Sequence, residues 1–384
     1  MAKAIGDVRS SSTALSLRSV WVLRMTLGWI TLLGAVLFLL GTSWDVQWHF
    51  DVGRDRTLTA PHLVMLGSIV VSGIATLAAV LIETRWARHS SLVMKNSTRF
   101  ADSFHSSLGA YIAGFGALDT AVGFPIDTYW HELYGIDVSI LAPFHVMIIT
   151  GMSIAALGAA YMLASATNLA MRDGAGKATV RSGYIGVIVA LATMMCNLML
   201  FVFGAFSRTG RIDLGVLVIN TFPLMVGGFG ALALVAAARA VPWRAAATLV
   251  AVVYLFFDLV IFLYVPFATN ALVGIEQQSY RPNASHNAII SLVWPISLIV
   301  AAIIIDLVNR RAQRKQWPPR VTNMRMISAV LIGFLAVSLL QPFFLFAARS
   351  LVSLGVSLLV GVLGSWLGYW FGAGLGDSLQ RVER

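Results

Sequence analysis

The segment DVQWHFDVGRDRTLTAPHLVMLGS, residues 45–68, joins two long apolar runs through a short polar stretch. Each run is long enough to cross a hydrocarbon core of about 30 Å as a helix. The polar stretch between them is typical of a turn at the membrane surface. Two apolar helices joined in this way form a transmembrane hairpin, so the segment predicts an all-α membrane fold.

The same alternation of apolar runs and polar turns continues along the 384-residue chain, which is 58% hydrophobic and 11% charged. We therefore predict a polytopic transmembrane helical bundle of about ten spans. The predicted spans lie near residues 22–44, 62–84, 103–124, 143–166, 183–207, 212–237, 245–269, 287–307, 326–348 and 351–373.

The distribution of basic residues predicts the orientation of these spans. With the N-terminus inside, cytoplasmic segments hold 21 of the 27 Lys and Arg residues, as the positive-inside rule requires. The opposite segments hold Arg54, Arg56, Arg208, Arg211, Arg281 and Arg349. We expect an integral protein of the cell membrane with both termini cytoplasmic. This orientation accounts for most of the net charge of +10, so the bilayer is the expected partner and nucleic acid is not.

A second stretch, DTYWHELYGIDVSILAPFHVMIITG at residues 127–151, repeats the pattern of the first. The matching positions are Asp45, His49, Asp55 and His62 in the first copy and Asp127, His131, Asp137 and His145 in the second. Four of the seven histidines fall in these two windows. Each copy joins an odd-numbered span to the next even-numbered one, which predicts a parallel repeat with both motifs at one depth on the extracytoplasmic side.

The spacing within each copy is typical of a metal site. Residues four apart share one face of a helix, so Asp45 and His49 can converge on one point, and His62 follows Pro61 at the start of the next helix. An Asp–His–His set suits copper, zinc, iron or nickel without choosing among them. The predicted metal ligands are Asp45, His49, His62, Asp127, His131 and His145. The alternative to a metal site is that these residues belong to a belt of aromatic and polar side chains at the membrane interface.

Further polar residues are candidates for supporting or catalytic roles. Asp55 and Asp137 are placed to orient the imidazoles. Asp119, two turns before Asp127, is a candidate proton relay or outer partner of the site, and a simple helix–helix hydrogen bond is the equal alternative. Asp258 is a second intramembrane carboxylate, and His286 is a candidate extra ligand or base. The lone Cys196 excludes a thiolate cluster.

The Asp-x3-His-x12-His pattern, followed by a second triad, resembles the C subunit of the particulate methane and ammonia monooxygenase family. The resemblance covers about residues 20–165 and includes the Trp-His, Arg-Asp and Pro-His elements of WHFDVGRDRTLTAPH. It implies copper at Asp45, His49 and His62, with His131 and His145 as ligands of a second site. The family has Asn where this chain has Asp127. Its enzymes also use partner subunits, one of them with a soluble cupredoxin region.

These observations favour a membrane metalloenzyme, most simply a copper-dependent oxidase or monooxygenase that acts on a small or lipophilic substrate, with iron or zinc as alternative metals. Such an enzyme needs an electron donor and, by the resemblance, partner subunits or a homo-oligomer. A metal-ion transporter, a non-catalytic metal-binding subunit and a non-redox Lewis-acid enzyme are the alternatives. We divide the chain into a cytoplasmic segment (1–21), a duplicated metal-binding half (22–166) and a further transmembrane half without an assigned role (167–384).

Overall fold

The computed structural model describes residues 15–53, 58–135, 139–202, 211–289, 292–341 and 348–383. Its helices are α1 (Leu17–Asp51), α2 (Ala60–Ala87), α3 (Ser91–Lys95), α4 (Leu108–Tyr134), α5 (Pro143–Arg172), α6 (Lys177–Met199), α7 (Phe222–Ala240), α8 (Ala246–Ile275), α9 (Val293–Lys315), α10 (Pro319–Leu339) and α12 (Leu351–Arg381). Two antiparallel pairs of short strands join them, β1 (Thr98–Phe100) with β2 (Phe104–Ser106) and β3 (Arg211–Asp213) with β4 (Val218–Asn220). The predicted all-α architecture is confirmed.

Eight of the described helices are long and apolar enough to cross a membrane, namely α1, α2, α5, α6, α7, α8, α10 and α12. A chain with this many apolar helices is an integral membrane protein. Helices α4 and α9 fall outside this set. Asp119, Pro125 and a polar last turn reduce the apolar character of α4, and α9 ends in a run of basic residues. The count of ten spans stays a prediction for these two helices.

Several element boundaries differ from the sequence prediction. The span expected from residue 103 begins at Leu108, because β1 and β2 form a hairpin whose last strand occupies Phe104–Ser106. The span expected from residue 212 begins at Phe222, after the β3–β4 hairpin. In contrast, α1 continues beyond its predicted end at residue 44 to Asp51, so the first motif lies on helical backbone.

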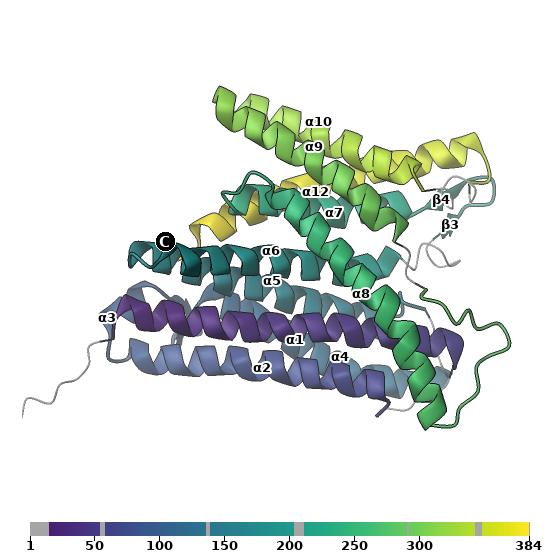
Figure 1. Cartoon of the computed structure of the whole chain (residues 1–384), viewed down its shortest axis with the longest axis horizontal. Helices are drawn as coiled ribbons and strands as arrows, with labels where there is room; N and C mark the ends of the chain where they lie inside the picture. The colour runs from purple at the N-terminus through teal and green to yellow at the C-terminus, as the bar shows by residue number, and fades with distance from the viewer. Residues whose placement is uncertain are drawn as a thin grey trace, which may run out of the picture.

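Helices α1, α2, α4 and α5 form a closed four-helix ring (Figure 1). Helix α1 contacts α2 and α5, and α4 likewise contacts α5 and α2. The α4–α5 contact is especially close, since a Cβ added to Gly116 would lie 2.4 Å from the carbonyl oxygen of Gly151. A Cβ added to Gly158 would lie 2.3 Å from the backbone nitrogen of Ala113. Small residues therefore allow the backbones of the two helices to touch.

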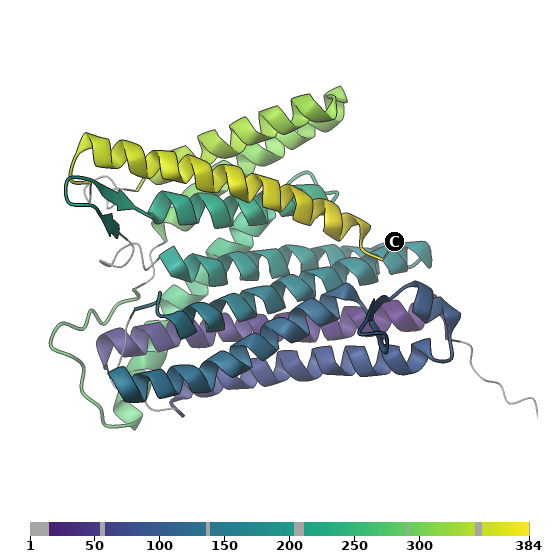
Figure 2. The same cartoon turned by 180° about the vertical axis from the view of Figure 1, so that it is seen from behind.

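The remaining helices pack onto one side of this ring. Helix α6 lies against α5, and α7, α9, α10 and α12 form a second group beyond it (Figures 1 and 2). Helix α8 crosses obliquely from this second group to the end of α1 (Figure 1). The last turns of α12 return to the ring beside α5 (Figure 2). Both ends of the four-helix ring are thus held by parts of the chain that are distant in sequence.

Candidate metal centre

The first motif forms where α1 ends and α2 begins. Thr59 caps α2 by accepting a hydrogen bond from the backbone N–H of His62, and Pro61 occupies the first turn, where its missing N–H costs nothing. Asp45 faces both imidazoles: its Oδ2 lies 3.2 Å from His49 Nδ1 and its Oδ1 lies 3.1 Å from His62 Nε2. All three side chains are largely buried. The predicted convergence of Asp45, His49 and His62 is therefore observed.

The second motif has the same arrangement where α4 ends and α5 begins. Asp127 Oδ2 lies 3.4 Å from His131 Nε2, and Asp127 Oδ1 lies 3.4 Å from His145 Nε2. One ligand atom from each of these three residues lies within 4.8 Å of the other two. Ligand atoms that share a metal ion at about 2.0–2.1 Å in tetrahedral geometry lie about 3.3 Å apart. The spacing in this triad is thus that of a metal-binding group.

The two motifs lie side by side. The imidazole rings of His49 and His131 are stacked with centroids 6.2 Å apart and planes 23° apart. Within the motifs, the rings of His49 and His62 are 6.2 Å apart and those of His131 and His145 are 5.6 Å apart. The structure therefore gathers all six predicted ligands into one group, which we call the Asp–His cluster.

Hydrogen bonds to the backbone fix which imidazole nitrogen carries the proton. Nδ1 of His145 lies 2.8 Å from the carbonyl oxygen of Ser139, and Nδ1 of His131 lies 3.2 Å from that of Gly135. A carbonyl only accepts, so each Nδ1 donates its proton, and in a neutral imidazole Nε2 then presents a lone pair. Both Nε2 atoms face Asp127, which also only accepts when ionised. Two acceptors that face each other at this distance need a proton or a metal ion between them.

Within the described residues, the carboxylates of the Asp–His cluster are paired with imidazoles. Among the described residues, Asp45 and Asp127 pair with histidines and with no Lys or Arg. In each carboxylate Oδ1 is buried and receives no hydrogen bond of acceptable geometry in this part of the chain. A buried carboxylate without a cation is costly. Two carboxylates and four imidazoles together offer a set of oxygen and nitrogen ligands suited to a cation.

The other predicted residues lie away from the Asp–His cluster or outside the described residues. Asp55 and Asp137 belong to the segments that the structure does not describe. Asp119 is half-buried on α4, eight residues or about 12 Å before Asp127, and therefore does not contact the cluster. Asp258 is buried on α8. His286 is exposed and packs against Tyr280 with ring centroids 4.1 Å apart, so its expected approach to the metal ligands is not observed.

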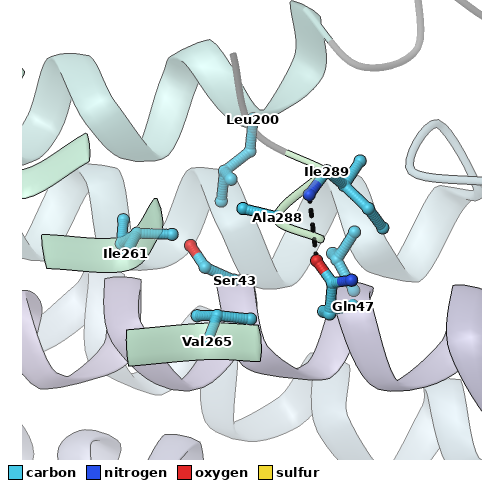
Figure 3. Close-up of a pocket in the computed structure, with 8 residues that line it drawn as sticks. Ser43, Gln47, Leu200, Ile261, Val265, Ala288 and Ile289 are labelled. Carbon is cyan, nitrogen blue, oxygen red and sulfur yellow. Dashed lines mark hydrogen bonds between the residues drawn. The ribbon is translucent and has the colours of Figure 1, made fainter. Parts of the chain in front are cut away.

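Sequence reasoning missed two residues that hold the motif end of α1 in place. Gln47 Oε1 accepts a hydrogen bond from the backbone N–H of Ile289 (Figure 3). Its Nε2 donates to Asp51 Oδ2 at 2.6 Å. The Asp51 carboxylate and carbonyl accept in turn from the backbone N–H groups of Ser285 and Arg281. These contacts bind the α8–α9 connection to α1. No local pattern reveals them, because more than 200 residues separate Asp51 from Ser285.

A small cavity adjoins this anchor on α1. Ser43 and Gln47 line it from α1, Ile261 and Val265 from α8, and Ile289 from the α8–α9 connection (Figure 3). Its volume of about 20 Å³ is enough for one water molecule, and the buried hydroxyl of Ser43 has no hydrogen-bond partner among the described residues. The cavity is too small for a substrate, so it belongs to the support of the site.

No family model, curated protein or solved structure matches this chain. The site is therefore defined by its own geometry: an Asp/His/His group able to bind a metal, within an integral membrane helical protein.

Proposed function

We propose that the Asp–His cluster is a copper centre, and that the chain is a membrane oxidase or monooxygenase acting on a small or lipophilic substrate. The observation that carries the metal site is the orientation of the imidazoles. His131 and His145 donate Nδ1–H to backbone carbonyls and direct Nε2 at Asp127. Ligand histidines characteristically donate their second ring N–H in this way, which fixes the tautomer and the ring plane.

The redox assignment rests on the ligand set and on the motif resemblance. Three protein ligands per motif leave coordination positions open for oxygen or substrate. The resemblance to the C subunit of the particulate methane and ammonia monooxygenase family favours copper over iron and zinc. A bound copper would supply oxygen activation and electron transfer. The four histidines would hold the metal together with Asp45 and Asp127, whose carboxylates also balance its charge. Asp55 and Asp137 would orient imidazoles, and Asp119 would relay protons along α4.

The membrane setting supports a lipophilic substrate and a separate source of electrons. The cluster lies at one end of a ring of mostly apolar helices, so a molecule dissolved in the bilayer can approach it from the side. An oxidase needs electrons from outside, which a partner subunit or a second copy of the chain would deliver. The cluster would lie on the extracytoplasmic side.

Metal content per chain tests the proposal. We would compare wild type, His49→Ala and His131→Ala, purified in detergent after copper-replete expression, with His286→Ala as the control because His286 is exposed and outside the cluster. We expect stoichiometric copper in wild type and His286→Ala and a loss in the other two variants. A wild type without stoichiometric metal would contradict the site.

Oxygen consumption then separates the functions that a metal site allows. Copper-loaded protein with an artificial electron donor should consume oxygen when a lipophilic substrate is added, and His131→Ala should not. Stoichiometric zinc, or copper without substrate-dependent oxygen consumption, would overturn the oxidase and favour a transporter or a non-catalytic subunit.

A further inference from the structure

An apolar groove runs between α2 and α4 along the four-helix ring. Its volume is about 490 Å³, within the range of small-molecule sites. It extends from Ile69 to Val80 on α2 and from Ala110 to Ala121 on α4, or about 17 Å along each helix. Its lining is mostly hydrocarbon, and the hydroxyl groups in it belong to Thr76 and Tyr111. The Thr76 hydroxyl donates to carbonyls of its own helix, so it offers no proton to a ligand in the groove.

The position of the groove determines what can fill it. Ile74 and Leu77 on α2 and Leu118 on α4 form its rim, and each is more than half exposed on the surface of the chain. These residues lie in the middle of their helices, at the level of the hydrocarbon core of a bilayer. Water is excluded from an apolar hollow at that depth, and alkyl chains are the groups available there.

The two ends of the groove differ. At the end far from the metal motifs, the exposed Phe100 of β1 packs on Tyr111 and Phe115 of the groove lining, with ring centroids 5.3 Å and 5.7 Å apart. At the other end the groove points toward the Asp–His cluster. The buried Phe124 follows Ala121 on α4 and places its ring edge-on to His62, with centroids 5.2 Å apart. One aromatic side chain therefore lies between the groove and a metal ligand.

We propose that this groove binds a single linear alkyl chain of a lipophilic molecule dissolved in the membrane, with the end of the chain at Phe124 beside His62. The inference rests on the proposed function, because it names the substrate class of the metal centre. The length of the groove favours a linear chain over a compact or branched molecule.

Photolabelling tests the groove without using the metal. Metal-free protein in phospholipid nanodiscs would be irradiated with a dodecyl probe that carries a diazirine, and separately with a phosphatidylcholine that carries the same group in one acyl chain. We expect the dodecyl probe to label residues 69–80 and 110–121, and excess dodecane to reduce that labelling at least fivefold. The phosphatidylcholine probe should label the outer surfaces of many helices, and dodecane should not displace it.

Two glycines on α2 provide a matched pair of variants. A Cβ at Gly73, which lines the groove, meets no atom within 4 Å, and the same is true at Gly67, which is exposed outside it. Both positions therefore accept a larger side chain without strain. We expect Gly73→Leu to reduce dodecyl labelling of the groove at least fivefold and Gly67→Leu to leave it unchanged. Equal labelling in the two variants, or no competition by dodecane, would overturn the proposal.

Phe124→Leu tests the connection to the metal centre. The smaller side chain should speed removal of bound copper by a membrane-soluble chelator at least threefold and leave removal by a water-soluble chelator unchanged. Equal acceleration of both would contradict a route from the groove to His62. If the protein holds no copper, the labelling experiment still shows whether the groove binds an alkyl chain. Failure of the proposed function and failure of this inference are therefore distinguishable.

Discussion

The four-helix ring holds a buried charged group at each end, and the two ends balance their charge in different ways. At the end far from the motifs, Arg24 donates two hydrogen bonds to Glu83, at 2.9 Å and 2.6 Å, and one to Glu383 at 2.6 Å. We call these three residues the Arg24 cluster. At the motif end, the Asp–His cluster also contains two carboxylates but, within the described residues, no Lys or Arg.

This difference indicates which end is built for a ligand. In the Arg24 cluster the chain supplies one cation for the two carboxylates, and Glu383 also accepts from Thr98 and from the first N–H of α4. In the Asp–His cluster no Lys or Arg of the described residues takes that place, and a proton or a metal ion can do so. Twenty-one residues, or about 31 Å of helix, separate Arg24 from Asp45, close to the thickness of a hydrocarbon core.

The largest expected effect follows from removing the cation of the Arg24 cluster. Arg24→Met leaves Glu83 and Glu383 buried without their partner, and we expect a loss of about 3–5 kcal/mol in the free energy of unfolding. Denaturant unfolding in detergent measures it. The matched control is Asp102→Asn, which breaks the exposed ion pair with Arg99 and should leave stability unchanged. If Arg24→Met left the free energy of unfolding unchanged, the Arg24 cluster would not depend on its own cation, and the contrast with the Asp–His cluster would fail.

Removing a carboxylate from the Asp–His cluster should not lower the free energy of unfolding of the metal-free protein. Asp127→Ala takes away a charge that no Lys or Arg of the described residues balances, so the metal-free protein should be no less stable than wild type. Its copper affinity should fall at least about 100-fold, because the second triad loses a ligand. Competition with a chelator and unfolding of the metal-free protein give the two values. Loss of stability without loss of affinity would make Asp127 a structural residue.

Glu383→Gln should lower the free energy of unfolding by less than Arg24→Met does. The substitution keeps the shape of the side chain and removes the charge that accepts from Arg24, Thr98 and Leu108. We expect the free energy of unfolding to fall by about 2 kcal/mol, within the range for hydrogen bonds to charged groups. Copper binding should be unchanged. Glu132→Gln, on the exposed last turn of α4, is the control. A fall in copper binding would show that the two ends are coupled.

The smallest expected effect concerns the anchor behind the metal motif. Asp51→Asn should lower the free energy of unfolding by about 1 kcal/mol. The amide keeps one acceptor for the backbone N–H of Ser285 but loses the charged oxygen that accepts from Gln47. Hydrogen exchange should rise in residues 281–289 and stay unchanged in α5. Unchanged exchange in that connection would mean that Gln47 alone holds it.

The local parts of the site were predictable from the sequence. The spacing of Asp45 to His49 and of Asp127 to His131 follows from the helical repeat, and Pro61 and Pro143 mark the helix starts that present His62 and His145. The apolar runs likewise predicted the helices. Two hairpins at the ends of expected spans were missed, because strands of three residues leave no period in the sequence.

The contacts between distant segments were not predictable. The predicted repeat indicates that both motifs lie at one depth, but it does not indicate that His49 on α1 stacks on His131 on α4. The pairing of Arg24 with Glu383 joins residues 359 positions apart, and a lone buried Arg near the start of the chain does not name its partner.

The bond from Arg24 to Glu383 also constrains how the protein is made. Arg24 on α1 and Glu83 on α2 belong to neighbouring helices, so this pair can form as soon as both helices are in the membrane. The carboxylate of Glu383 reaches Arg24 only after α12 has been inserted and folded back beside α5. The end of the ring opposite the metal ligands is therefore completed only when α12 is in place, because Glu383 follows Ser165 of α5 by 218 residues.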